Sequence, residues 1–436
     1  MRAAIKSVLI VMAVVSVLTF AACGNKKDQT LEEKYRINNY SAVFYDNGSA
    51  DYRNYGKGTA EDTVFELASN GKTVAAYIAL KMTEEGILSL DDRIAQYLDP
   101  DLITDDERLD DITLRQLLCH TAGFSPNYEL GTDKKIYSDP GTRFCYSGVG
   151  YIYLQSVIEN ASGMTLEQAA SHYVFEPLGM NNSTFEGRAT VLPYMDPGSA
   201  FLYAMAVFVL SFILLLAAAG LTGKLTGFRY FSFKSAFAVC FLAAGIINSV
   251  FLLFFFVSKV FALFLACFAL LGTGLFITGK KSKLFYLFIP VVTLLFAVLA
   301  FALPYGIPVT NDVIAKKANC AYTFKSSTRD MSVFCNELMN KAKDPGDGLN
   351  EMFLSAVTID DRNAWGLGIA IEQTGGAETT YWHSGINPGF QSLYVLYPEQ
   401  DKFAVILTNS DNGLDFSKDM TRAFLGVDGE WDIPRG

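Results

Sequence analysis

Acidic residues are missing from a long central part of this sequence. Between Asp196 and Asp312 there is no Asp and no Glu. The charged residues of that stretch are all basic: Lys224, Arg229, Lys234, Lys259, Lys280, Lys281 and Lys283. The whole chain has 45 acidic against 35 basic residues, so the remainder is strongly negative. Phosphate binding needs a basic surface, and this balance therefore argues against nucleic acid as a partner.

Histidine is also scarce, with 3 residues in the whole chain. His120, His172 and His383 are too scattered to match the ligand spacing of a zinc site. The motif G-x-S-x-G does not occur, so a serine nucleophile of the α/β-hydrolase type is not supported. His172 lies in a helical pattern, which favours a surface or packing role. We expect neither a metal nor a cofactor.

The N-terminus has the pattern of a lipoprotein-type signal peptide over residues 1–23. Arg2 and Lys6 precede an apolar run that is shorter than the roughly 20 residues of a bilayer span. Two alanines and then Cys23 end the run, which resembles a bacterial lipobox with Phe20 where Leu is usual. We expect acylation of Cys23, with ordinary cleavage or an uncleaved anchor as alternatives. The polar residues 24–39 are interpreted as a tether.

Four windows of the acid-free stretch are long and apolar enough to cross a bilayer. They lie at 200–221, 236–257, 260–279 and 284–303. They are apolar on all sides, which excludes amphipathic helices on a membrane surface. We therefore interpret residues 197–304 as four transmembrane helices. Because the windows contain no charged residue, transport through them is disfavoured.

The basic residues set the orientation of these windows. They gather in the first and third connections, and positively charged connections stay in the cytoplasm. With an even number of spans, the flanking parts 40–196 and 305–436 both lie on the extracellular side. The signal peptide directs the first of them there independently. The sequence thus predicts a multi-pass protein of the bacterial cell membrane, in contact with membrane lipid.

The chain contains one S-x-x-K, formed by Ser69-Asn70-Gly71-Lys72. A helical pattern follows as far as Gly86, which places the serine at a helix start and the lysine one turn later on the same face. The N-terminus of a helix favours negative charge that develops near the serine oxygen. Lys72 can act as a base only if burial or a cationic neighbour lowers its pKa.

Further motifs follow in a characteristic order, at 85–92, 112–124, 140–148, 177–180, 327–331, 365–368 and 383–390. The last one is His383-Ser384-Gly385-Ile386-Asn387-Pro388-Gly389-Phe390. Together with S-x-x-K they resemble the serine β-lactamases and penicillin-binding proteins, in the branch related to class C β-lactamases. The resemblance implies an α+β fold of the β-lactamase/transpeptidase type, an antiparallel sheet flanked by helices. Here four transmembrane helices would interrupt it.

The resemblance also implies a role for each motif. Ser69 would be the acylated nucleophile, and Lys72 and Tyr146 would share its proton as general bases. The substrate would lie along His383, Ser384, Gly385 and Ile386. The backbone N–H groups of Ser69 and Ile386 would form the oxyanion hole. His120 falls in a loop motif that is structural in the family.

The expected function is hydrolysis of an amide or ester through an acyl-serine, on a small-molecule or peptidoglycan-derived substrate. The alternatives are a peptidoglycan- or β-lactam-binding sensor without significant turnover, and a β-lactamase proper. Gly148 stands where the family has the Asn of Y-x-N, which contacts the substrate's acylamide group and helps to position the lysine. We therefore expect poor penicillin and cephalosporin hydrolysis and better turnover of simple esters or short D-amino-acid amides.

Two further expectations concern strands and cysteines. Strands are expected at 369–373, 391–397 and 403–409, which are rich in β-formers. Four cysteines would face the outside, where disulfides persist. We expect the pairs Cys119–Cys145 and Cys320–Cys335, with four free thiols as the alternative.

Overall fold

The computed structural model describes residues 29–125, 134–187, 189–191, 194–195, 307–308, 318–375 and 378–433. The chain divides into two compact units. The larger one comprises Ile37–Pro193 and Asn311–Gly436, and the smaller one comprises Met1–Arg36 and Tyr194–Thr310. The larger unit therefore combines the two parts of the chain that flank the predicted membrane segment.

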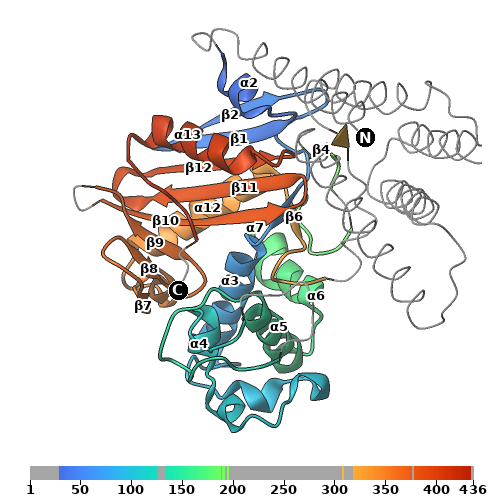
Figure 1. Cartoon of the computed structure of the whole chain (residues 1–436), viewed down its shortest axis with the longest axis vertical. Helices are drawn as coiled ribbons and strands as arrows, with labels where there is room; N and C mark the ends of the chain where they lie inside the picture. Colours follow the sequence, from blue (N-terminus) through green and yellow to red (C-terminus); the bar gives the residue numbers. More distant parts are fainter. Residues whose placement is uncertain are drawn as a thin grey trace, which may run out of the picture. The chain divides into compact units, whose positions relative to one another are not determined.

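An antiparallel sheet of eight strands forms one side of the larger unit, in the order β2-β1-β12-β11-β10-β9-β8-β7 (Figure 1). The strands are β1 Tyr40–Asp46, β2 Ser49–Tyr55, β7 Val357–Thr358, β8 Asn363–Trp365, β9 Ala370–Gln373, β10 Thr379–Asn387, β11 Phe390–Tyr397 and β12 Lys402–Thr408. Strand β1 pairs with β12 from Tyr40 opposite Thr408 to Asp46 opposite Lys402. The antiparallel sheet is confirmed, and the three predicted strands match β9, β11 and β12 to within one residue at each end.

Two helices cover the central strands. Helix α12 (Thr328–Lys343) and helix α13 (Gly413–Leu425) both pack against β11 and β12. Figure 1 shows α13 in front of the sheet and α12 behind it. Nearly every residue of β11 and β12 is buried. This is why these strands have continuous apolar sequences rather than an alternating pattern.

A helical lobe lies beside the sheet (Figure 1). Its helices are α3 Gly71–Glu84, α4 Leu114–Leu118, α5 Gly148–Ser162, α6 Leu166–Ala170 and α7 Glu176–Leu178. The short helical turns of the lobe are η2 Ile94–Tyr97, η3 Pro100–Leu102, η4 Glu107–Asp111 and η5 Ser171–Phe175, whereas η7 Gly348–Phe353 follows α12 and η8 Pro398–Gln400 joins β11 to β12. Helix α3 is the buried axis of the lobe and packs against α5, α6 and η5.

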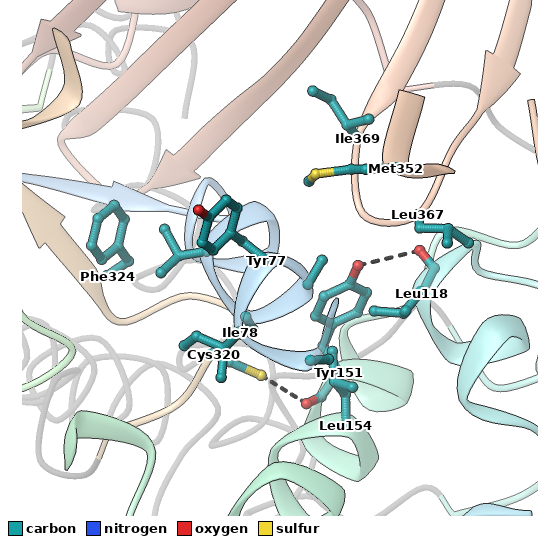
Figure 2. Packing of buried hydrophobic residues seen from close by; sticks show 14 of the residues in the cluster. Tyr77, Ile78, Leu118, Tyr151, Leu154, Cys320, Phe324, Met352, Leu367 and Ile369 are labelled. Atoms are coloured by element: carbon teal, nitrogen blue, oxygen red, sulfur yellow. Dashed lines mark hydrogen bonds between the residues drawn. The ribbon is translucent and has the colours of Figure 1, made fainter. Parts of the chain in front are cut away.

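The core around α3 contains polar groups that are satisfied by backbone carbonyls. Figure 2 shows Tyr151, whose hydroxyl donates to the carbonyl oxygen of Leu118 at 3.3 Å. The carbonyl oxygen of Tyr151 in turn accepts the S–H of Cys320 at 2.8 Å. These bonds connect α5 to α4 and to the segment that follows the predicted insert.

A second, two-stranded sheet connects the lobe to the chain that follows the predicted membrane segment. Strand β3 (Phe65–Ala68) pairs antiparallel with β6 (Phe324–Ser326). Strand β3 leads directly to Ser69. Its partner β6, which is distant in sequence, therefore lies against the start of the S-x-x-K motif.

The smaller unit contributes few described residues. They form the helix α2 (Leu31–Tyr35) and the strands β4 (Tyr194–Met195) and β5 (Ile307–Pro308). Strands β4 and β5 pair antiparallel, which brings together the chain just before and just after the predicted membrane segment. No helix among the described residues is long and apolar enough to span a bilayer. Cys23 and the four windows within 197–304 lie outside the described residues.

The predicted disulfides are wrong, because Cys119, Cys145, Cys320 and Cys335 are all free. The thiol of Cys119 lies 3.2 Å from the hydroxyl oxygen of Thr121, and that of Cys320 donates to a backbone carbonyl. Burial raises the pKa of all four thiols. They therefore stay neutral and pack as small, weakly polar side chains.

Candidate active site

Ser69 lies in a tight turn between β3 and α3. The residue before it, Ala68, has a φ of 46°, in the left-handed region that non-glycine residues rarely adopt. Helix α3 begins at Gly71, two residues later than the sequence pattern predicts. A Cβ on Gly71 would lie 2.7 Å from the Cβ of Phe324 on β6. The second x of S-x-x-K is therefore glycine because the helix start packs directly on β6.

The serine and the lysine of the motif are in direct contact. The Nζ of Lys72 donates to the Oγ of Ser69 at 2.9 Å, as the one-turn spacing predicts. Both groups also donate to one backbone oxygen, that of Ala321, at 2.6 Å from Lys72 Nζ and 3.2 Å from Ser69 Oγ. The three atoms form a compact triangle that holds the ammonium group against the hydroxyl.

The surroundings of Lys72 favour its neutral form. The side chain is fully buried, and this burial lowers its pKa to about 7. The Cys320 thiol is a weaker influence in the opposite direction. A lysine with such a pKa is partly unprotonated at neutral pH and can accept a proton from a hydroxyl. Desolvation therefore lowers the pKa of Lys72, as a role as a base requires.

Tyr146 and His383 complete the polar lining next to the lysine. The Nζ of Lys72 lies 5.1 Å from the ring centroid of Tyr146. The hydroxyl of Tyr146 is 3.5 Å from Nε2 of His383, a long and weak hydrogen bond. Nδ1 of His383 lies 2.8 Å from the carbonyl oxygen of Ser384, so this nitrogen carries the proton and Nε2 is an acceptor. Burial, and then the charge of Lys72, lower the pKa of His383 to about 3.

His120 packs against Tyr146. Its Nδ1 accepts the backbone N–H of Ser147 at 3.1 Å, and its ring centroid is 4.5 Å from that of Tyr146. Burial, assisted by the charge of Lys72, holds the pKa of His120 well below its usual value. His120 is thus a neutral packing residue. His172 is exposed and contacts Tyr173.

The end of β10 approaches Ser69. Strand β9 pairs with β10 from Thr379 to Trp382, and the residues that follow on β10 continue beyond it. A Cβ on Gly385 would lie 1.9 Å from the carbonyl oxygen of Leu67, so only glycine allows the strand to pass this close to the turn before Ser69. The next side chain, Ile386, is 52% exposed, although its neighbours on the strand are buried.

Gly148 is the first residue of α5 and is buried. The helix is capped by Ser147, whose hydroxyl accepts the N–H of Gly150 at 3.0 Å. The position that carries an amide side chain in the family pattern therefore has none here. The Nζ of Lys72 donates to the carbonyl oxygen of Ala321 as well as to Ser69.

Sequence reasoning missed three groups around this site. Ala321 acts through its backbone oxygen, and no sequence pattern identifies such a group. Glu66 and Asn387 are buried and joined by a hydrogen bond of 2.8 Å. Asn387 lies inside the last motif, and its polar amide at that position was the only feature of the sequence that could have identified it. Among the described residues, no cluster of His, Cys, Asp and Glu could hold a metal ion.

The chain matches a known protein family over most of its length. A family model described as Beta-lactamase matches residues 25–204 and 305–427, which is more than half of the chain. The match is interrupted between these two ranges, in a part that contains all of the four apolar windows except the first five residues of the first one.

Individual relatives match smaller parts. Penicillin-binding protein 4 of Amycolatopsis lactamdurans is 27% identical over 147 residues, which cover 30% of this chain and 39% of the relative. Monacolin J acid methylbutanoyltransferase of Aspergillus terreus is 29% identical over 161 residues, covering 29% and 38%. The chain thus spans well under half the length of these relatives. A D-stereospecific amidohydrolase from Streptomyces sp. has a similar fold, with a TM-score of 0.57, 16% identity, and coverage of 92% of this chain and 99% of that one.

Proposed function

Because the chain belongs to the β-lactamase family of serine hydrolases, we propose that it cleaves an amide or ester through an acyl-serine at Ser69. The observation that carries this proposal is the 2.9 Å contact between Lys72 Nζ and Ser69 Oγ, combined with a lysine pKa near 7. A neutral amine at that distance is within reach of the hydroxyl proton.

In the proposed reaction, Lys72 takes the hydroxyl proton while Ser69 Oγ bonds to the carbonyl carbon of the substrate. The backbone N–H groups of Ser69 and Ile386 stabilise the negative charge on the carbonyl oxygen, and one such donor is typically worth roughly 10²–10³ in rate. The intermediate then expels the amine or alcohol, which receives the proton from Lys72 through the hydroxyl of Tyr146. Water attacks the acyl-serine, Lys72 takes its proton, and this proton passes to Ser69 Oγ as the carboxylic acid product is released.

The substrate proposal rests on Gly148. A site that lacks a hydrogen-bonding partner for an acylamide group does not select for that group. The nucleophile, the base and the proposed oxyanion donors do not need the missing amide, so acyl transfer itself is retained. We propose simple esters or short D-amino-acid amides, including cell-wall D-peptides, as the preferred class. The name of the Aspergillus relative, an acyltransferase, is compatible with ester chemistry on this type of site.

The test has two parts. Incubation with a fluorescent acylating probe should label the wild-type protein and leave Ser69→Ala unlabelled, since the covalent bond needs the hydroxyl. The ratio of kcat/KM for a short p-nitrophenyl ester to that for nitrocefin should favour the ester. Equal labelling of Ser69→Ala would exclude the acyl-serine. A clear preference for nitrocefin would make β-lactam hydrolysis the main activity.

We also propose that the enzyme is anchored in a bacterial cell membrane with its catalytic unit outside. The support is the acid-free stretch with four apolar windows, and the antiparallel pairing of β4 with β5 at its two ends. Reporter fusions after 221 and 279 should be cytoplasmic, and those after 257 and 305 external. Cys23→Ser should abolish acyl labelling without releasing the protein from the membrane. A soluble Cys23→Ser protein would contradict the four spans.

A further inference from the structure

Asn387, the last residue of β10, has a buried side chain with two partners. Its Nδ2 donates to Oε2 of Glu66 at 2.8 Å and to the carbonyl oxygen of Tyr322 at 3.1 Å. Both N–H bonds of the amide are therefore used, and neither partner is on the same strand as Asn387.

Each partner belongs to a different wall of the site. Glu66 is on β3, the strand that leads into Ser69. Tyr322 directly follows Ala321, whose carbonyl oxygen accepts from the lysine and the serine of the motif. Asn387 itself directly follows Ile386. One amide group thus joins the three segments that supply the nucleophile, the acceptor for the base and the second oxyanion donor.

Loss of these hydrogen bonds should cost free energy, because the groups that they join are buried. Glu66 is buried, and burial raises the pKa of its carboxyl, while the bond from Asn387 and the charge of Lys325 act in the opposite direction. Without the amide, a carboxylate oxygen and a backbone carbonyl would lose their donor inside the protein. A buried polar group that loses its partner bears the full desolvation penalty, and the chain shifts to avoid it. The end of β10 pairs with β11 as far as Asn387 opposite Phe390, so we expect the shift to occur at this end of the two paired strands.

The spacing at this point matters for catalysis. Gly385 already passes within contact distance of the Leu67 carbonyl. The N–H of Ile386 must be held at a fixed distance from that of Ser69 if both are to reach one oxygen atom. Contact with Leu67 limits how closely β10 can approach, and the bond from Asn387 to Glu66 adds to the pairing with β11 in holding the strand against the turn.

We propose that Asn387 is a positioning residue that, through Glu66 and the Tyr322 carbonyl, sets the width of the oxyanion hole between Ser69 and Ile386. The proposal rests on the acyl-serine function proposed above. Such a residue acts on the chemical step, because the charge on the oxygen develops only in the transition state. A residue that merely stabilised the fold would leave the turnover of the folded enzyme unchanged.

The experiment removes the Asn387–Glu66 bond from either end. Asn387→Ala and Glu66→Ala should each lower kcat for a p-nitrophenyl ester about 10-fold to 100-fold, with KM changed less than about threefold. Glu66→Gln keeps an acceptor for the amide and should stay within about threefold of the wild type in kcat. The double variant Asn387→Ala with Glu66→Ala should be scarcely worse than either single one, because both remove the same bond.

Asn350→Ala is the matched control. Its Nδ2 also donates to two acceptors, the carbonyl oxygens of Lys341 and Ala342, at 3.0 and 3.2 Å, where η7 meets α12. The Asn350→Ala substitution should lower the free energy of unfolding without changing kcat. If Asn387→Ala does not fold, the contrast between Glu66→Ala and Glu66→Gln decides the question alone.

Three outcomes would overturn the proposal. The first is an Asn387→Ala enzyme, folded by circular dichroism, with the wild-type kcat. The second is full multiplication of the two single effects in the double variant. The third is equal loss in Glu66→Gln and Glu66→Ala. A wild type that the acylating probe fails to label would instead overturn the proposed function, and this proposal with it.

Discussion

Two lysines, Lys72 at the start of α3 and Lys325 on β6, are both fully buried, yet their surroundings are opposite. Burial lowers the pKa of each. The Nζ of Lys72 donates to a hydroxyl and to a backbone carbonyl, and burial is the largest influence on its pKa. Lys325 lies near Glu66 and Glu167, and both carboxylates favour its charged form.

This difference shows that burial alone does not make a base. A buried ammonium group loses its proton readily only when no negative charge compensates for the lost water. For Lys72, burial outweighs the opposing influence of the Cys320 thiol on the pKa, and the amine contacts the hydroxyl that it would deprotonate. The Nζ of Lys325 donates to the carbonyl oxygen of Thr323 at 2.7 Å and contributes to the packing of β6.

The largest expected effect follows from removing the proposed base. Lys72→Ala should lower kcat roughly 10²–10⁴-fold, the usual contribution of a positioned general base. Urea unfolding should show no matching loss of stability, because the variant also removes a desolvated amine. Steady-state kinetics on a p-nitrophenyl ester, with Ser69→Ala as the blank, measures the effect. A Lys72→Ala enzyme with more than about a tenth of wild-type kcat would contradict this role.

The next effect concerns pH. The proposed base acts when it is neutral, so kcat/KM should rise with pH through about 7, the value to which burial lowers the pKa of Lys72. Below that value kcat/KM should fall about tenfold per pH unit. Since the usual pKa of lysine is 10.5, the unfolded chain binds more protons between about 7 and 10.5. The contribution of Lys72 to the free energy of unfolding should therefore increase with pH across that window.

A profile of kcat/KM that stays flat between pH 5.5 and 8 would contradict this assignment. The same profile recorded for Lys325→Met should keep the inflection of the wild type, because Lys325 is not in contact with the nucleophile. Loss of the inflection in that variant would show that the two lysines had been assigned the wrong way round.

The smallest effect is expected from Lys325→Met itself. The substitution leaves the Thr323 carbonyl without its donor and Glu66 without a nearby positive charge. A loss of about 1–3 kcal/mol in the free energy of unfolding should result, measured by urea denaturation. The value of kcat should stay within about threefold of the wild type. A drop comparable to that of Lys72→Ala would remove the distinction between the two lysines.

Local patterns predicted the parts of this molecule that depend on short stretches of chain. The one-turn spacing of Ser69 and Lys72 brings them together in any helix, and the observed contact follows from it. Apolar runs bounded by turn residues predicted β9, β11 and β12 to within one residue. The helix begins two residues later than predicted, at Gly71, where the chain packs closely on Phe324.

Distant contacts could not be predicted in the same way. The bond from Lys72 to Ala321 joins groups 249 residues apart, and the acceptor is a backbone atom that every residue possesses. The bond from Asn387 to Glu66 likewise spans 321 residues. The disulfide prediction failed for a related reason, since counting cysteines says nothing about where the thiols lie in the fold.

The sequence by itself determined the identity and order of the proposed catalytic groups, because a motif is a property of neighbouring residues. It also determined the uneven charge that distinguishes residues 197–304, since the charge of a segment depends on its composition alone. Only the tertiary structure decided that Lys72 is desolvated, that a carbonyl beyond the insert holds it, and that Asn387 joins three walls of the site. Burial and long-range contact arise when segments remote in sequence are packed together, and a pKa responds to that packing rather than to the residue's neighbours along the chain.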